Sequence, residues 1–403
     1  MADQDKTRAV TPGRLFAAKA VLAFGALVIG TAEFAAMGLL PSVASAMDVS
    51  IPDAGHTISV YALGVVIGSP TIAIVGARMD RRLLLTLLAL LILVGNAASS
   101  IAGNFPSLLL ARFVTGLPHG AYYGIAAVVV AGMVPHDRRT AAIGHVMLGF
   151  AAATLIGVPL VTWMGQALGW RWSFGSMAVG AAILAASMPF AVPRTMPDAD
   201  TSPLSELSAF RNLQVWLTLA TATVGFGGMF AVYSYITPTL TNATGLANDQ
   251  VPLFLAIFGV GMVVGNIVGG KLADRQLGAT IVGMLLWNAV FIGGFSFAAN
   301  SVPTAAACLF LIGMGYGLVP ALQTRLMDVA PKAKSLAAAS NHSAFNLANA
   351  IGALAGGAAI AAGWGWTSPG AVGGMLALAG TVIFVVALRL DSSSPDSLNA
   401  AKA

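Results

Sequence analysis

Twelve long apolar runs, separated by short polar connections, constrain this chain more than any other feature of its sequence. Of its 403 residues, 57% are hydrophobic and only 9% are charged, and the mean hydropathy is +0.84. A helix needs about 20 mainly apolar residues to cross a bilayer. The runs lie near residues 16–40, 56–76, 83–103, 105–134, 140–164, 172–192, 213–238, 250–270, 279–299, 303–327, 335–362 and 369–390. The sequence therefore predicts an all-α polytopic membrane protein with twelve transmembrane helices.

The 20 Lys and Arg residues are distributed unevenly around these runs. Eighteen lie in the two tails, in the even-numbered connections or in the adjoining ends of the runs, and the exceptions are Arg112 and Arg171. Basic residues in short loops accumulate on the cytoplasmic side of a membrane. We therefore expect both termini to be cytoplasmic, in a multi-pass protein of the bacterial cytoplasmic (inner) membrane. The same bias accounts for the net charge of +5 without a nucleic-acid partner.

The amino-terminal run could also be read as a cleaved secretory signal, because basic residues precede it and Ala44-Ser45-Ala46 follows it. The run is too long for a signal peptide and carries Glu33 in its apolar part, so an uncleaved first helix is the better interpretation. Cys308 is the only cysteine, which excludes an intramolecular disulfide.

A Gly-x-x-x-Asp-Arg loop occurs twice, 194 residues apart (270 − 76), which is close to half the chain. The copies are Gly76, Asp80 and Arg81 after the second run, and Gly270, Asp274 and Arg275 after the eighth. Each copy joins a descending helix to an ascending one, so the halves are predicted to be parallel repeats of six helices. The predicted parts are an N-terminal bundle (1–192), a cytoplasmic linker (193–212) and a C-terminal bundle (213–403). Gly allows tight packing and Asp can lie against a helix N-terminus, so these loops could gate access from the cytoplasm.

Six-plus-six parallel repeats around a mid-membrane site describe the major facilitator architecture, and specific motifs add to the resemblance. The first loop resembles the family's Gly-x-Leu-x-Asp-Arg loop, although its basic tail is absent here. The stretch that begins at Arg112 and contains His119 resembles the Arg motif of the fourth helix. Three further residues match the spacing of the fifth-helix antiporter motif, namely Gly149, Gly157 and Pro159. The resemblance covers nearly the whole chain.

Two segments narrow the resemblance to the drug:proton antiporter-1 branch. Thr31-Ala-Glu33-Phe34 is typical of that branch's first helix, and Gly169-Trp-Arg-Trp-Ser-Phe174 closes the fifth-helix motif as the branch does. Within the branch, Tyr61-Ala-Leu-Gly and Pro118-His119-Gly120 look most like the AraJ-type sugar (arabinose) efflux transporters. The resemblance implies a proton-driven exporter.

Glu33 is the only one of the 15 Asp and Glu residues that lies within a predicted span. An ionisable side chain inside a membrane costs on the order of 2.5–3.5 kcal/mol, and it usually faces a cavity or a partner. Arg112 lies at a similar depth, about 11–12 Å below the predicted outer end of its own helix. Because the resemblance places the first and fourth helices beside the central cavity, we predict a Glu33–Arg112 pair.

Two roles are open for this pair. Burial disfavours a charged carboxylate and a nearby guanidinium favours it, so opening the cavity could load or release a proton at Glu33. Alternatively, Glu33 binds substrate hydroxyls and Arg112 bonds helix carbonyls. His119 and Tyr123 share a helical stripe with Arg112, and His119 either shuttles protons or packs structurally beside glycines.

Polar and aromatic residues of the second half are further candidates for the cavity lining. These candidates are Tyr233, Tyr235, His342, Asn346 and Asn349. The Asn side chains could equally bond across membrane helices as structural contacts, and Tyr rings near a membrane surface also serve as plain anchors.

No motif of an enzyme is present. The chain lacks the Gly-rich phosphate-binding loop of ATPases, a Cys/His cluster with metal spacing, and a nucleophile–base pair. We expect no cofactor, a monomer in the lipid bilayer, and proton antiport that exports a sugar or an amphipathic drug. The alternatives are a facilitator or proton symporter that imports a small solute, and a membrane sensor or scaffold without transport activity.

Overall fold

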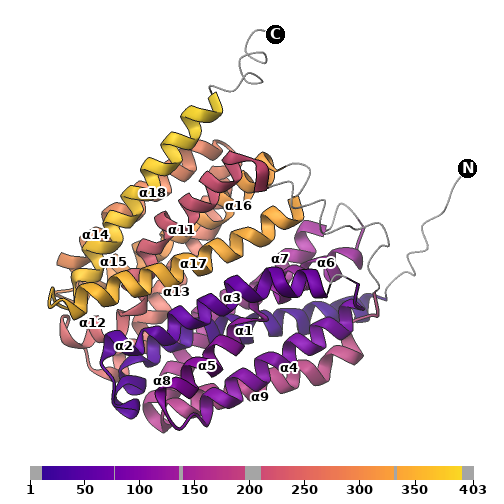
Figure 1. Ribbon diagram of the computed structural model, residues 1–403, viewed down its shortest axis with the longest axis horizontal. Helices are drawn as coiled ribbons and strands as arrows, with labels where there is room; N and C mark the ends of the chain where they lie inside the picture. The colour runs from indigo at the N-terminus through magenta and orange to yellow at the C-terminus, as the bar shows by residue number, and fades with distance from the viewer. Residues whose placement is uncertain (1–10, 77, 136–138, 196–209, 331–333, 393–403) are drawn as a thin grey trace, which may run out of the picture.

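The protein is a bundle of antiparallel helices in two groups (Figure 1). The computed structural model describes residues 11–76, 78–135, 139–195, 210–330 and 334–392. Over these ranges the chain is helical and contains no strand. Eleven helices in the described ranges are long and apolar enough to cross a membrane. With α3, which has 20 residues, the twelve predicted spans are accounted for, and the all-α polytopic class is confirmed.

The predicted spans correspond to helices, several of which are broken once. The helices of the first half are α1 (Pro12–Met47), α2 (Ile51–Ala54), α3 (His56–Val75), α4 (Arg81–Ser100), α5 (Phe105–Gly116), α6 (His119–Gly132), α7 (Arg139–Ala152), the π-helical turn η2 (Ala153–Gly157), α8 (Val158–Leu168) and α9 (Trp170–Ala191). Those of the second half are α11 (Leu213–Ser234), α12 (Ile236–Asn242), η4 (Asn248–Gln250), α13 (Val251–Ala273), α14 (Leu277–Ala298), α15 (Val302–Met314), η5 (Gly315–Gly317), α16 (Leu318–Val329), α17 (Lys334–Ala361) and α18 (Ser368–Ser392). Most of the predicted linker lies outside the described residues.

The first helix extends further than predicted. Its end was placed near Leu40, but α1 continues to Met47. Pro41 lies inside the helix and does not end it. The helix ends where Asp48 adopts a left-handed conformation with φ of 53°, a backbone geometry that Asp tolerates better than most residues.

Glycine packing repeats between the halves with a constant offset of 197 residues. A Cβ atom on Gly64 would overlap the carbonyl oxygen of Phe113, and one on Gly261 would overlap that of Phe310. The same relation holds for two more pairs: Gly68 against Leu117 with Gly265 against Met314, and Gly116 against Tyr61 with Gly313 against Phe258. Small residues at such crossings allow close backbone approach. The contact of α3 with α5 is therefore repeated by α13 with α15, as expected for parallel repeats.

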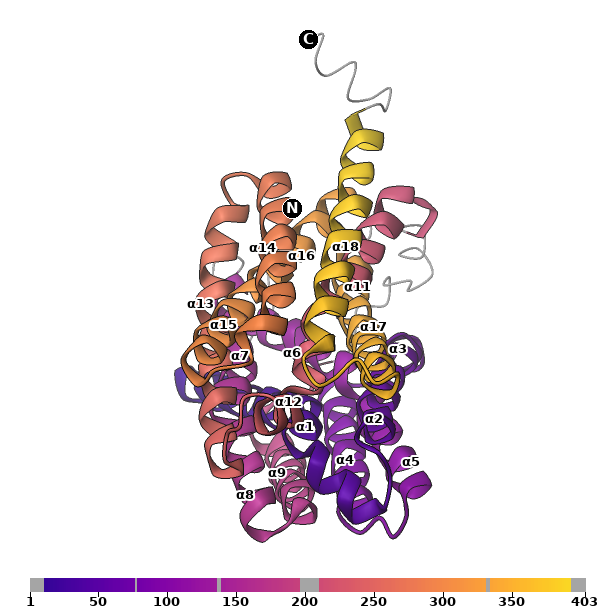
Figure 2. The ribbon, with the colours of Figure 1, turned by 90° about the vertical axis from the view of Figure 1, so that its left-hand side faces the viewer.

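The two halves meet at one end of the molecule and in its middle. We call the side at which α1 begins and α18 ends the terminal side, and the opposite side the distal side. On the distal side α12 packs on α1, and α2 packs on α17 (Figures 1 and 2). Toward the terminal side the two groups of helices diverge (Figure 1). This conformation is closed on the distal side.

Candidate functional site

Three buried polar side chains are connected in the middle of the first half. Oε2 of Glu33 on α1 lies 3.8 Å from Nε2 of His119, the first residue of α6. Nδ1 of the same ring lies 2.8 Å from the hydroxyl of Tyr61 on α3, within hydrogen-bonding distance. Glu33 is 5% exposed, His119 2% and Tyr61 1%. The histidine ring thus connects a carboxyl group to a phenol away from bulk water.

The partner of Glu33 differs from the predicted one because α1 is longer than expected. Glu33 lies 14 residues before the distal end of α1 (47 − 33), and His119 lies 14 residues after the start of α5 (119 − 105). At 1.5 Å per residue both are about 21 Å from the distal ends of their helices. Arg112 is two turns nearer the distal side, and no Glu33–Arg112 ion pair occurs among the described residues.

Arg112 is nevertheless connected to the same site through Tyr61, whose hydroxyl group bonds His119. Its guanidinium lies 4.5 Å from the centre of the Tyr61 ring and 5.3 Å from that of Phe174. The side chain is fully buried, and within the described residues none of its three nitrogens has a hydrogen-bond partner. The contacts of this charge are therefore with aromatic faces.

Tyr123 and His342 extend the site into the second half. The ring of Tyr123 lies 5.1 Å from that of His119, and its hydroxyl donates to the carbonyl oxygen of Ala26 at 3.0 Å. His342 of α17 stacks on Tyr123 with centroids 5.7 Å apart and planes 5° apart. The predicted stripe on the fourth span therefore meets a histidine from the opposite half.

The remaining predicted lining residues lie in different places. Asn346 donates to the carbonyl oxygen of His342 in its own helix at 3.0 Å. Asn349 is fully buried, and neither polar atom of its side chain has a partner in the described part of the chain. Tyr235 lies on the distal side and donates to the carbonyl oxygen of Ala353 at 2.9 Å. Neither Tyr235 nor the two Asn residues line the pocket described next.

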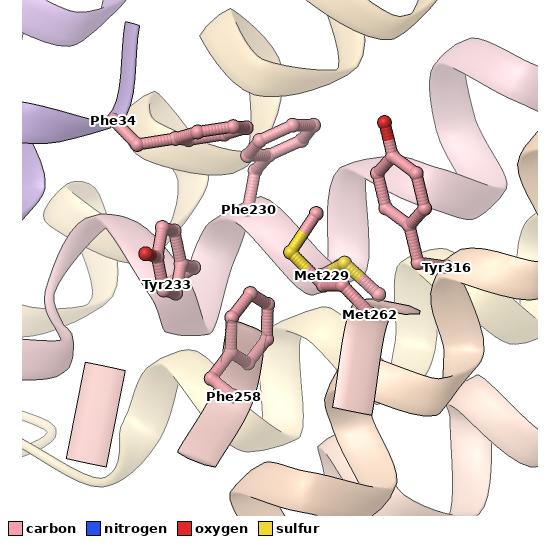
Figure 3. A pocket seen from close by; sticks show the side chains of 7 residues that line it. All are labelled: Phe34, Met229, Phe230, Tyr233, Phe258, Met262 and Tyr316. Carbon is pink, nitrogen blue, oxygen red and sulfur yellow. The ribbon is translucent and has the colours of Figure 1, made fainter. Parts of the chain in front are cut away.

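A narrow pocket of about 10 Å³, with room for about one water molecule in this conformation, is lined by aromatic and Met side chains between α1 and the second half (Figure 3). Its lining consists of Phe34, Met229, Phe230, Tyr233, Phe258, Met262 and Tyr316. Tyr233 stacks on Phe258 with centroids 4.3 Å apart. None of these lining residues is charged. Aromatic faces and flexible thioethers bind apolar rings, and Phe34 follows Glu33 directly in the chain.

Of the pocket residues only Tyr233 was predicted. The loop spacing of 194 does not lead to the others, whereas the packing offset of 197 seen in the structure relates two of them to residues of the first half. Adding the offset of 197 to Tyr61 gives Phe258, and adding it to His119 gives Tyr316. The positions that hold hydrogen-bonding groups in the first half therefore hold aromatic side chains of the pocket in the second. The halves share one packing scheme but carry different chemistry.

The two Gly-x-x-x-Asp-Arg loops also differ. Asp80 caps α4 by accepting from the backbone N–H of Leu83 at 2.9 Å, and it accepts from that of Thr195 at 3.1 Å. The backbone N–H of Arg81 donates to the carbonyl oxygen of Thr195 at 2.9 Å. Gly76 packs against Leu84, whereas a Cβ atom on Gly270 would have no atom of the described residues within 4 Å. In the second loop α14 begins after Gln276 without a side-chain cap.

This difference leads to a first prediction. Replacing Asp80 by Ala removes the cap of α4 and should lower the free energy of unfolding by about 0.5–2 kcal/mol. Asp274→Ala is the matched control and should have a smaller effect, because the side chain of Asp274 does not cap α14. The thermal denaturation midpoints of the two purified variants in detergent test this expectation, and equal midpoints would contradict it.

The fifth-helix residues bring this span close to α1. A Cβ atom on Gly149 would overlap the carbonyl oxygen of Ala23, and one on Gly157 would overlap the hydroxyl of Thr31. The π-helical turn η2 ends at Gly157, just before Pro159. Such turns occur where a helix is locally widened, often near functional sites. The motif accordingly sets the approach of the fifth span to the helix that carries Glu33.

Comparison with known proteins identifies the family. The sequence model of the Major Facilitator Superfamily matches residues 22–276 and 219–403. The chain belongs to the Major Facilitator Superfamily. It is a multi-pass membrane transporter and not an enzyme, as predicted.

Two curated relatives and one solved structure illustrate the similarity. Inner membrane transport protein YdhP of Escherichia coli K12 is 40% identical over 370 residues, which cover 91% of this chain and 95% of YdhP. AraJ of the same organism is 33% identical over 339 residues, which cover 83% of this chain and 86% of AraJ. The crystal structure of a D-xylose–proton symporter has a TM-score of 0.72 at 16% identity, covering 92% and 97%, and it shows the shared fold. The predicted AraJ-type resemblance and inner-membrane location agree with these relatives.

Proposed function

We propose that this transporter exports an amphipathic small molecule from the cytoplasm in exchange for protons, by alternating access and as a monomer. The termini would lie in the cytoplasm, so the distal side would face outward. Energy would come from the proton gradient without a cofactor. The observation that carries the proposal is the buried Glu33–His119 contact beside Phe34 of the aromatic pocket.

Adjacency on α1 provides a link between proton and cargo. The pocket is too narrow for a cargo in this conformation, so the cargo would enter as the halves move apart and would then contact Phe34. Glu33 is the neighbouring residue and lies beside His119. Occupancy of the pocket would change the surroundings of the carboxyl group, and a carboxyl group's proton affinity depends on burial and on nearby charge. Arg112 supplies a positive charge to the same region. In this scheme Glu33 carries the proton and Arg112 favours its charged form.

The apolar lining favours an amphipathic, ring-containing cargo over a sugar. Sugars bind to aromatic faces as well, but they also need several polar partners for their hydroxyl groups. The hydroxyls of Tyr233 and Tyr316 are the polar atoms of the pocket-lining side chains. A sugar therefore remains the second candidate for the cargo.

Transport into proteoliposomes under imposed pH gradients tests the exchange. An antiporter accumulates cargo in an acidic lumen, because protons that leave drive cargo inward. An importing symporter accumulates the same cargo in an alkaline lumen, and a facilitator accumulates it under neither gradient. The direction of the pH gradient that drives accumulation does not depend on how the protein is oriented in the vesicle. As a second prediction, we expect the transporter to accumulate cargo in the acidic lumen. Accumulation only in the alkaline lumen would refute proton antiport.

A further inference from the structure

The carbonyl group of Met37 in α1 lacks its usual helical donor. A residue in an α-helix normally accepts from the backbone N–H four positions later, and here that position is Pro41, which has no N–H. Met37 is fully buried, so water does not replace the missing donor. An unsatisfied buried carbonyl group is costly.

Thr237 of the second half supplies the missing bond. Its hydroxyl oxygen lies 3.2 Å from the carbonyl oxygen of Met37 and 3.2 Å from that of Gly38, so its single hydrogen is shared between these two acceptors. Thr237 is 2% exposed. The contact thus connects α12 to α1 across the two halves on the distal side.

The break between α11 and α12 places Thr237 next to the carbonyl group of Met37. Tyr235 lies at the break, with φ of −111° and ψ of 22°. Its hydroxyl group occupies the space that a Cβ atom would need on Gly55 of the first half or on Gly357 of the second. The break at Tyr235 therefore packs against both halves, and Thr237 in the following turn lies against α1.

We propose that Thr237 stabilises the distal-closed state by donating to the carbonyl group that Pro41 leaves free, and that this bond breaks when the distal side opens. The inference rests on the alternating-access cycle proposed above. In the open state both groups would be hydrated, so the bond favours closure specifically. Thr237 would be a positioning residue of the transport cycle that touches neither proton nor cargo.

The test is a double-mutant cycle on distal accessibility. Cys308→Ser removes the natural thiol, and Ala54→Cys places a probe in α2 at a fully buried position of the distal interface. The readout is the rate at which a membrane-impermeant maleimide labels that cysteine. Thr237→Val, which keeps the side-chain shape, should raise the rate about 2- to 10-fold, the range expected for one hydrogen bond.

Pro41→Ala restores a backbone N–H to the helix, so Met37 no longer needs Thr237. In that background Thr237→Val should change the labelling rate by less than about twofold. Thr241→Val is the matched control, because the Thr241 hydroxyl donates only within α12, to the carbonyl oxygens of Thr237 and Pro238. It should leave the rate near that of the parent.

An equal effect of Thr237→Val with and without Pro41→Ala would overturn the proposal, as would no effect in either background. Elution of each variant as a single species in size-exclusion chromatography shows that it is folded. Labelling needs neither cargo nor a proton gradient. A failure of proton antiport would therefore leave this result unchanged, and the two proposals can fail separately.

Discussion

Glu33→Gln is expected to abolish pH-driven accumulation of cargo, down to the level of vesicles without protein. Gln has nearly the shape of Glu but cannot bind or release a proton, so the exchange loses its coupling. Cargo binding should survive, because the aromatic pocket is intact. The measurement is uptake into proteoliposomes with an acidic lumen, together with cargo binding in detergent.

The matched control for this variant is Asp249→Asn, which makes the same chemical change at an exposed position. It should retain full accumulation. Undiminished accumulation by Glu33→Gln would show that Glu33 does not carry the proton. Loss of both binding and accumulation would favour the alternative in which Glu33 contacts the cargo directly.

The second large effect is expected from Gly116→Ala. A Cβ atom there would overlap the backbone carbonyl oxygen of Tyr61, which cannot move without shifting α3. Overpacking of this kind typically costs about 1–3 kcal/mol. We therefore expect a marked fall in the thermal denaturation midpoint and, since Tyr61 is bonded to His119, weaker transport.

Gly124→Ala in the same span is the natural comparison. No atom lies within 4 Å of a Cβ atom placed there in the described structure, and Ala stabilises a helix over Gly by roughly 0.5–1 kcal/mol. The midpoint of Gly124→Ala should therefore stay level or rise. A similar fall in both variants would mean that the Gly116 crossing is not as close as described.

The spans were predictable from sequence because the bilayer imposes a local rule on each apolar run. Glu33 could be named as a candidate site residue for a related reason, because a single acidic residue within an apolar run is conspicuous. Its contact with His119 was missed, because depth was measured from Leu40 whereas α1 ends at Met47. A difference of seven residues is about two helical turns, the separation between Arg112 and His119 on their shared stripe.

The aromatic pocket was harder to predict, for a physical reason. Phe34, Phe230 and Phe258 are apolar residues in apolar helices, and composition does not distinguish a ring that lines a pocket from one that faces lipid. Tyr233 and Tyr235 were predicted together as aromatic lining residues of the seventh span, but the break at Tyr235 separates them. One lies in the pocket and the other between the halves on the distal side.

The difference between the halves suggests how one fold could couple proton binding to cargo binding. The first half contributes the ionisable groups around His119, and the second half contributes most of the pocket lining. Phe34 is the exception, since it reaches the pocket from the helix that carries Glu33. The proposed proton site and the proposed cargo site therefore include adjacent residues of this helix.

Proton release on cargo binding tests this coupling most directly. Purified protein in weakly buffered detergent at mildly alkaline pH would receive amphipathic aromatic compounds and sugars in turn, with pH and binding recorded together. We expect the wild type to release protons when an amphipathic compound binds, and Glu33→Gln to bind the same compound without release. Binding by the wild type with no proton release, or equal release by both proteins, would contradict it.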